Sequence, residues 1–187
     1  MKRLRTRLAG LLLAGAISIV ATAAQHDQRA DRTVQPDAGQ DRIAKEVRHE
    51  LVMLPYYGVF DDFEYSVNGN TVTLMGRVTR PALKNDAESA VKHIEGVERV
   101  DNQIEVLPLS PMDDRIRIAE YRAVYGEPGL DRYALQAVPP IHIIVDNGHV
   151  TLVGVVASQE EKDLAGIRAN TVSGVFSVDN KLRVEGK

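Results

Sequence analysis

The chain of 187 residues contains no cysteine and no tryptophan. Without cysteine, disulfide bonds, thiolate metal sites and thiol nucleophiles are excluded, and so is the lipid-bearing cysteine of a lipoprotein. The HExxH, GxSxG and glycine-rich phosphate-loop motifs are also missing, and the five histidines stand singly, without a second ligand at metal spacing. The sequence therefore predicts a protein that is not an enzyme and that has no cofactor and no metal.

Positive charge is concentrated at the start of the chain. Four basic residues precede an apolar stretch, 8–21, and Ala21-Thr22-Ala23 has the small-x-small form of a cleavage site. The apolar stretch is shorter than the roughly 20 residues that span a membrane. Residues 1–23 are therefore interpreted as a cleavable signal peptide of an exported protein.

The rest of the chain has an excess of acidic residues. Without residues 1–23, it keeps 19 of its 23 basic residues against 26 acidic ones, which gives a net charge of −7. A mildly acidic surface argues against nucleic acid as a partner. Residues 24–40 are polar and lack apolar periodicity, so they are expected to form a flexible lead.

One stretch of the sequence occurs twice. Val72-Thr-Leu-x-Gly76-x-Val78 returns 78 residues later, and so does Gly96-Val97-x-x-Val100-Asp-Asn102. Over the 40 positions from 67 to 106, 14 residues are identical to those at the same offset, and no gap is needed. A self-match at one fixed offset indicates a duplicated structural unit.

Each copy predicts the order helix, strand, strand, helix, strand. In the first copy a helical stripe in 41–54 is followed by alternating strands around an Asn/Gly turn, a helix from Pro81 and a strand at 100–106. In the second copy Ile118, Tyr121 and Tyr125 are placed in one apolar stripe of the first helix. We predict an α+β fold of two tandem two-layer domains, each α-β-β-α-β, with a three-stranded mixed sheet packed on two helices.

The predicted organisation is a signal peptide (1–23), a flexible lead (24–40), a first domain (41–107), a linker (108–112) and a second domain (113–187). Six repeated residues are interpreted as structural: Gly76, Gly96, Asn102, Gly154, Gly174 and Asn180. The mid-strand glycines predict close packing, which we assign to the following helix, and the next two glycines are placed at helix ends. The asparagines are expected to bond to the backbone through their side chains.

Aromatic residues are few, and eight of the nine lie in or beside the segment between the first helix and the first strand of each copy. These rings either close the open end of a small sheet or form a contact surface beside arginines. Seven residues of the second copy are the candidate membrane or partner contact: Arg115, Tyr121, Arg122, Tyr125, Leu130, Arg132 and Tyr133.

The doubled V-x-L-x-G-x-V and G-V-x-x-V-x-N motifs, behind a signal peptide, resemble the BON (bacterial OsmY and nodulation) domain family. The resemblance covers about 41–107 and 113–186. It implies tandem α-β-β-α-β domains, location in the bacterial periplasm, and binding to phospholipid or other envelope surfaces in envelope or osmotic stress. It brings no catalytic residues with it.

The leading hypothesis is a non-enzymatic periplasmic protein, not a lipoprotein, that attaches to phospholipid membrane surfaces. The alternative is a chaperone-like protein that binds unfolded or partner proteins of the envelope. Interface aromatics favour lipid, whereas the acidic net charge favours a protein partner. The sequence leaves the oligomeric state open.

Overall fold

The computed structural model describes residues 38–136 and 138–186. The proposed signal peptide and most of the predicted lead lie outside the described residues. The first repeat contains α1 (Ala38–Val52), β1 (Asp62–Asn68), β2 (Thr71–Val78), α2 (Pro81–Lys92), β3 (Arg99–Asn102) and β4 (Glu105–Val106). The second repeat contains α3 (Pro111–Tyr125), the 3-10 helix η1 (Asp131–Leu135), β5 (Ile141–Asp146), β6 (His149–Val156), α4 (Gln159–Ala169), β7 (Ser177–Asn180) and β8 (Arg183–Val184).

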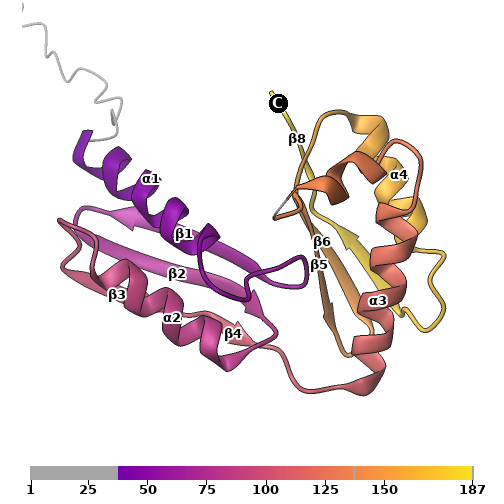
Figure 1. Cartoon of the computed structure of the whole chain (residues 1–187), viewed down its shortest axis with the longest axis horizontal. Helices are drawn as coiled ribbons and strands as arrows, with labels where there is room; N and C mark the ends of the chain where they lie inside the picture. Colours follow the sequence, from indigo (N-terminus) through magenta and orange to yellow (C-terminus); the bar gives the residue numbers. More distant parts are fainter. Residues whose placement is uncertain (1–37, 137, 187) are drawn as a thin grey trace, which may run out of the picture. The chain divides into compact units, whose positions relative to one another are not determined.

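Each repeat is a two-layer α+β unit, as predicted. In the first, β1 runs antiparallel to β2, and β2 runs parallel to β3 and β4. The second has the same mixed order in β5 to β8. Figure 1 shows two helices packed over each sheet, as the helix–strand contacts of both repeats require.

The predicted last strand is broken into two short strands in both repeats. In the first repeat the side chain of Asn102 explains the break, because its Oδ1 accepts from the backbone of Ile104 at 3.2 Å and its Nδ2 donates to the carbonyl of Lys84 at 2.9 Å. Asn180 makes the same two bonds, with Leu182 and Lys162. The asparagine thus turns the next apolar residue into the core and ties the strand to the helix above it.

The mid-strand glycines lie close to a different part of the chain from the one predicted. Gly76 and Gly154 have φ angles of +109° and +124°. A Cβ on Gly76 would lie 2.2 Å from the carbonyl oxygen of Asp62, and one on Gly154 would lie 1.9 Å from that of Pro140. The close approach is to the start of the neighbouring strand, so the assignment to the following helix is wrong.

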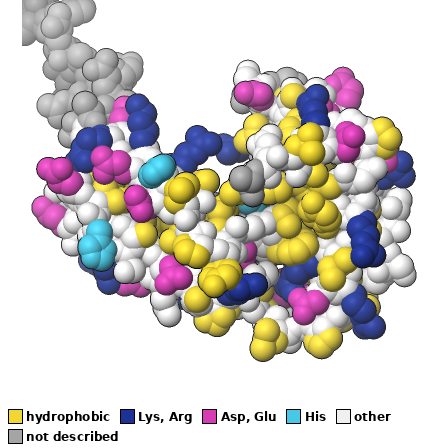
Figure 2. All heavy atoms as spheres, in the orientation of Figure 1, with side chains coloured by type: hydrophobic (Ala, Val, Ile, Leu, Met, Phe, Trp, Pro, Cys, Tyr) yellow, Lys and Arg dark blue, Asp and Glu magenta, His cyan; other side chains and the backbone are white. Residues whose placement is uncertain are grey.

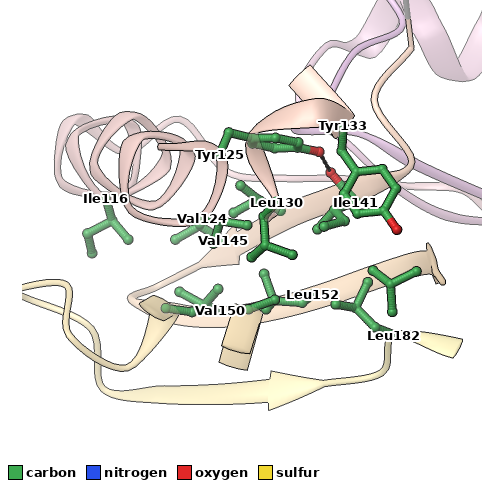
Figure 3. Packing of buried hydrophobic residues seen from close by; sticks show 14 residues of the cluster. Ile116, Val124, Tyr125, Leu130, Tyr133, Ile141, Val145, Val150, Leu152 and Leu182 are labelled. Carbon is green, nitrogen blue, oxygen red and sulfur yellow. Dashed lines mark hydrogen bonds between the residues drawn. The ribbon is translucent and has the colours of Figure 1, made fainter. Parts of the chain in front are cut away.

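The first helix of the second repeat also differs from its predicted stripe. Ile116, Val124 and Tyr125 are its buried apolar residues, whereas Ile118 is 49% exposed. Figure 3 shows Tyr125 reaching over the core with its hydroxyl at the carbonyl of Ile141, to which it donates a hydrogen bond. The rest of this core comes from the inward faces of β5 and β6, from Ala165 and Ala169 of α4, and from Leu130, Tyr133 and Leu182.

Residues of both repeats meet within one compact unit. The carbonyl of Val59, between α1 and β1, accepts from the backbone of Ile143 in β5 at 2.8 Å. Nδ1 of His142 donates to the carbonyl of Gly58, so Nε2 accepts from the hydroxyl of Tyr57, 3.4 Å away. Burial lowers the pKa of His142, which keeps the ring neutral in this contact.

Candidate functional site

Of the seven predicted contact residues, three are buried, three are exposed and Tyr121 is intermediate. Tyr125, Leu130 and Tyr133 belong to the core, with at most 8% of their surface exposed. These three side chains therefore lie in the core of the second repeat and not at its surface. Tyr121 is half-buried and packs on Tyr125 and on Phe60 of the first repeat.

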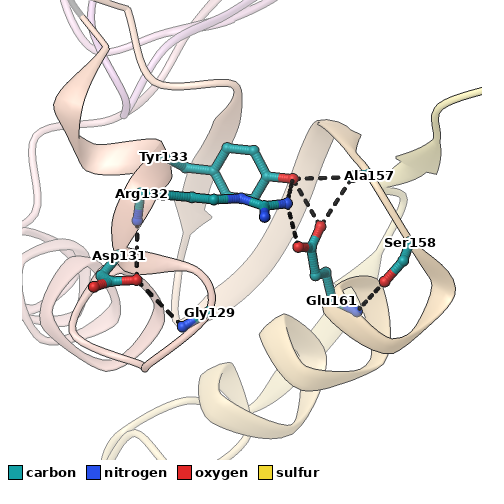
Figure 4. A network of polar contacts seen from close by, with 7 residues as sticks. All are labelled: Gly129, Asp131, Arg132, Tyr133, Ala157, Ser158 and Glu161. Carbon is teal, nitrogen blue, oxygen red and sulfur yellow. Dashed lines mark hydrogen bonds and ion pairs between the residues drawn. The ribbon is translucent and has the colours of Figure 1, made fainter.

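A polar network explains why Tyr133 lies inward. Its hydroxyl donates to Glu161 at 2.7 Å and accepts from the backbone of Ala157 at 2.9 Å, just before α4. Figure 4 shows the guanidinium of Arg132 completing the network by pairing with Glu161. Ser158 caps the same helix by accepting from the backbone of Glu161. These contacts fasten the long connection after α3 onto α4, which indicates a structural role.

Arg115 and Arg122 remain as the exposed basic residues of α3. Two apolar side chains share their face: Met112 is 45% exposed and Ile118 is 49% exposed. At 100° per residue, these four residues fall within one 120° arc of the helix. The helix therefore presents a mixed stripe of exposed basic and apolar side chains (the α3 stripe).

A further exposed aromatic residue lies at the same end of the repeat as Met112. Phe176 is 78% exposed, and its ring covers Gly148 in the turn between β5 and β6. Met112 contacts Gly174, two residues before Phe176. Phe176 is the one aromatic residue that sequence reasoning left aside, because it lies far from the other eight. Its place two residues after Gly174, where the first repeat has Glu98, was the available signal.

The corresponding surface of the first repeat is polar. Ile118 is the eighth residue of α3, and the eighth residue of α1 is Lys45. Phe176 corresponds to Glu98, which accepts from the side chain of Asn70 at 2.8 Å. In the view of Figure 2, acidic side chains are frequent over the first repeat, and hydrophobic ones gather over the second. Apolar and basic side chains are thus combined at the exposed surface of the second repeat.

A groove of about 610 Å³ runs between strands of the two repeats. Its lining mixes carboxylates such as Asp62 and Glu64 with the cations Arg77 and Lys181. Burial, and next the charge of Glu64, raise the pKa of Asp62 to about 6. Among the residues that the structure describes, no three His, Asp or Glu side chains are grouped as a metal site requires. Within the same residues, no helix combines the length and the apolar character that crossing a membrane demands.

One buried carboxylate has no apparent structural task. Glu120 is fully buried in α3, and neither of its carboxyl oxygens has a hydrogen-bond partner within the described part of the chain. Burial alone raises its pKa to about 8, so the group is mostly protonated at neutral pH. Val47 holds the corresponding tenth position of α1, where it is also fully buried. The second repeat therefore carries an ionisable group at a core position.

The comparisons with known proteins identify the family. The model of the BON domain matches residues 40–108 and 130–186, one segment in each repeat. The chain belongs to the BON domain family. It is a tandem BON protein, and membership supports a non-catalytic, envelope-associated binding protein, since BON domain proteins are typically periplasmic and bind membrane phospholipids in general. No curated protein matches this BON chain.

Two solved structures are similar to the tandem BON chain. The first is CdsD, a structural protein of the type III secretion system of Chlamydia trachomatis, at 12% identity over 78% of this chain and 94% of that chain, with a TM-score of 0.30. The second is the C-terminal domain of CdsD, at 13% identity over 75% and 96% of the two chains, with a TM-score of 0.27. Superpositions as loose as these carry no information about function.

Proposed function

We propose that the protein attaches to anionic phospholipid surfaces of the bacterial envelope through its second BON repeat. The proposal includes export by the signal peptide, location in the periplasm and a role in envelope or osmotic stress. The observation that carries it is the α3 stripe together with Phe176, which combines exposed apolar side chains with Arg115 and Arg122.

The chemistry of this surface fits the boundary of a lipid layer. Exposed apolar side chains gain free energy on entering the acyl boundary, and arginines beside them pair with phosphate groups. Each basic residue held near an anionic membrane contributes about 1 kcal/mol at physiological ionic strength. The net charge of the exported chain is acidic, so attraction must come from this local grouping and not from the protein as a whole.

Co-sedimentation with vesicles tests the proposal. The chain from Ala24 onward should pellet with vesicles that contain phosphatidylglycerol, less at high salt, and not with pure phosphatidylcholine. Arg115→Glu/Arg122→Glu should abolish pelleting, because it reverses the charge of the α3 stripe. The matched control is Arg42→Glu/Arg48→Glu on α1. Equal pelleting of both double variants would overturn the assignment to the second repeat.

The chaperone-like alternative is favoured by one other surface. At the end of α1, Met53 is 68% exposed and Tyr56 is 70% exposed, beneath the guanidinium of Arg80 at 4.8 Å. Tyr56 also has a φ of +69°, a strained conformation for a residue with a side chain. If this surface binds unfolded proteins, the chain should suppress aggregation of a reduced client without lipid, and Met53→Ser/Tyr56→Ser should remove that activity.

A further inference from the structure

Three outward backbone groups, spread along the outer edge of β5, have hydrogen-bond partners. The backbone of Ile143 donates to Val59, so residues 141, 143 and 145 direct their backbone groups away from β6. The carbonyl of Ile141 accepts from the hydroxyl of Tyr125. The carbonyl of Val145 accepts from Arg117 at 2.7 Å. Each of these three outward-facing residues therefore has a partner.

The outer edge of β1 has the same register and none of these partners. Phe63, Tyr65 and Val67 lie opposite Gly76, Leu74 and Val72, as residues 141, 143 and 145 lie opposite 154, 152 and 150. Their backbone groups accordingly point outward from the sheet. No other described residue bonds to those outward groups. Figure 1 shows β1 at the edge of its sheet.

The cause of this difference is in the first helix of each repeat. Tyr125 is the last residue of α3, and Val52 is the last of the equally long α1. Arg117 is the seventh residue of α3, and Ala44 is the seventh of α1. Neither valine nor alanine has a side-chain donor, so α1 leaves the carbonyls of β1 unpaired. An open strand edge of this kind is a template for another strand.

We propose that two copies of the chain pair through β1, antiparallel, about a two-fold axis at Tyr65. In this register Phe63 lies opposite Val67 of the copy, and Glu64 lies opposite Ser66. All outward backbone groups of the strand then meet partners, and no like charges face each other. If the pair were centred on Phe63 instead, Asp62 would lie opposite Glu64. Repulsion between the two carboxylates disfavours that register.

The dimer closes on itself, because a two-fold contact uses the same edge of both copies. A single strand pair buries less than the roughly 1,600 Å² of a standard interface, so we expect a weak dimer that forms at high protein concentration. The contact uses the first repeat and is independent of the α3 stripe. Its failure would leave the proposed membrane attachment intact.

Sedimentation velocity over a concentration series tests the pairing and its register. The chain from Ala24 onward should show a monomer–dimer equilibrium. Ser66→Glu, at an exposed position, sets two carboxylates opposite each other at both symmetric places and should weaken the dimer about tenfold. Glu64→Ser/Ser66→Glu should restore it, and Glu64→Lys/Ser66→Glu should strengthen it beyond the original.

A second variant covers the outer edge of β1 with the two side-chain donors, an arginine and a tyrosine, that the second repeat uses at β5. Ala44→Arg/Val52→Tyr supplies donors for the carbonyls of Val67 and Phe63 and should abolish the dimer. Lys45→Arg/His49→Tyr, on the exposed side of α1, should leave it unchanged. Unchanged thermal unfolding confirms that each variant is folded. A chain that stays monomeric at millimolar concentration, or a dimer indifferent to both Ser66→Glu and Ala44→Arg/Val52→Tyr, would overturn the proposal.

Discussion

At the tenth residue of its first helix, the first repeat has Val47 and the second has Glu120. Similar exchanges set Lys45 against Ile118 and Glu98 against Phe176. None of these positions is identical between the copies, whereas the glycines and asparagines of the repeated motif occupy equivalent places in both. The motif maintains the fold, and the residues outside it give each repeat its own surface.

The connections after the first helices differ in the same way. In the first repeat the connection is short, and its Tyr57, Gly58 and Val59 bond to β5 of the second repeat. In the second repeat it is longer, and it folds back on its own α4 through Tyr133 and Glu161. One connection therefore joins the repeats, while the other completes a core.

The largest expected effect on stability comes from substituting the mid-strand glycine that both repeats share. Gly154→Ala would place a Cβ 1.9 Å from the carbonyl of Pro140 at a φ of +124°, so we expect the free energy of unfolding to fall by more than about 3 kcal/mol. Gly76→Ala should do the same in the first repeat. Gly69→Ala is the control, because its Cβ would meet open space; it should cost about 1 to 2 kcal/mol for its positive φ. Urea unfolding measures all three, and equal losses would contradict the account.

Glu120 should make the second repeat sensitive to pH. Its pKa is about 8 in the folded chain against 4.5 ordinarily, so the folded state holds a proton that the unfolded state releases. The contribution of Glu120 to stability should be greatest below pH 4.5 and fall by up to about 1.4 kcal/mol per pH unit between 4.5 and 8. Glu120→Val should remove this slope and stabilise the repeat at pH 8 by about 2 to 4 kcal/mol.

The matched control for this prediction is Glu46→Val, which removes an exposed glutamate from α1 and should keep the slope. Urea unfolding at a series of pH values measures the effect. Asp62 contributes to the slope with the same sign, since its pKa is also raised, so the quantity to compare is the difference between variant and parent. Parallel curves for the parent and Glu120→Val would show that the carboxyl has found a partner.

A smaller loss is expected at the repeated asparagines. Asn180→Ala removes the bonds to Lys162 and Leu182 and should cost about 1 to 2 kcal/mol. Asn102→Ala should cost at least as much, because Asn102 also donates to Glu88 at 3.0 Å. Asp179→Ala is the control, since the side chain of Asp179 forms an exposed ion pair with Lys181, and should have almost no effect. Thermal unfolding measures the stability of the three variants. The largest loss for Asp179→Ala would contradict this ranking.

The fold was largely readable from the sequence because alternation, helical stripes and the duplication all report local or repeated contacts. The break in the last strand was not, since it depends on how an asparagine reaches a helix that is distant in sequence. The neighbour of Gly76 was missed for the same reason. A glycine indicates that another part of the chain lies close to it, but not which part.

The candidate site was readable only in part. Arg115 and Arg122 are exposed, as their helical spacing allows. The aromatic residue type alone does not reveal that Tyr125 and Tyr133 are buried and not at the surface. Both rings lie in the core because their hydroxyls find partners there, a backbone carbonyl for one and Glu161 for the other. The sequence could not show that the apolar contribution to this surface comes from Ile118 and Phe176.

Vesicle binding by variants matched across the two repeats tests the central claim most directly. Ile118→Ser/Phe176→Ser should reduce co-sedimentation with phosphatidylglycerol vesicles at least tenfold, because two exposed apolar side chains no longer enter the lipid boundary. Lys45→Ser/Glu98→Ser, at the same places in the first repeat, should bind like the parent. Equal binding by both variants, or a loss with the first-repeat variant alone, would contradict the account.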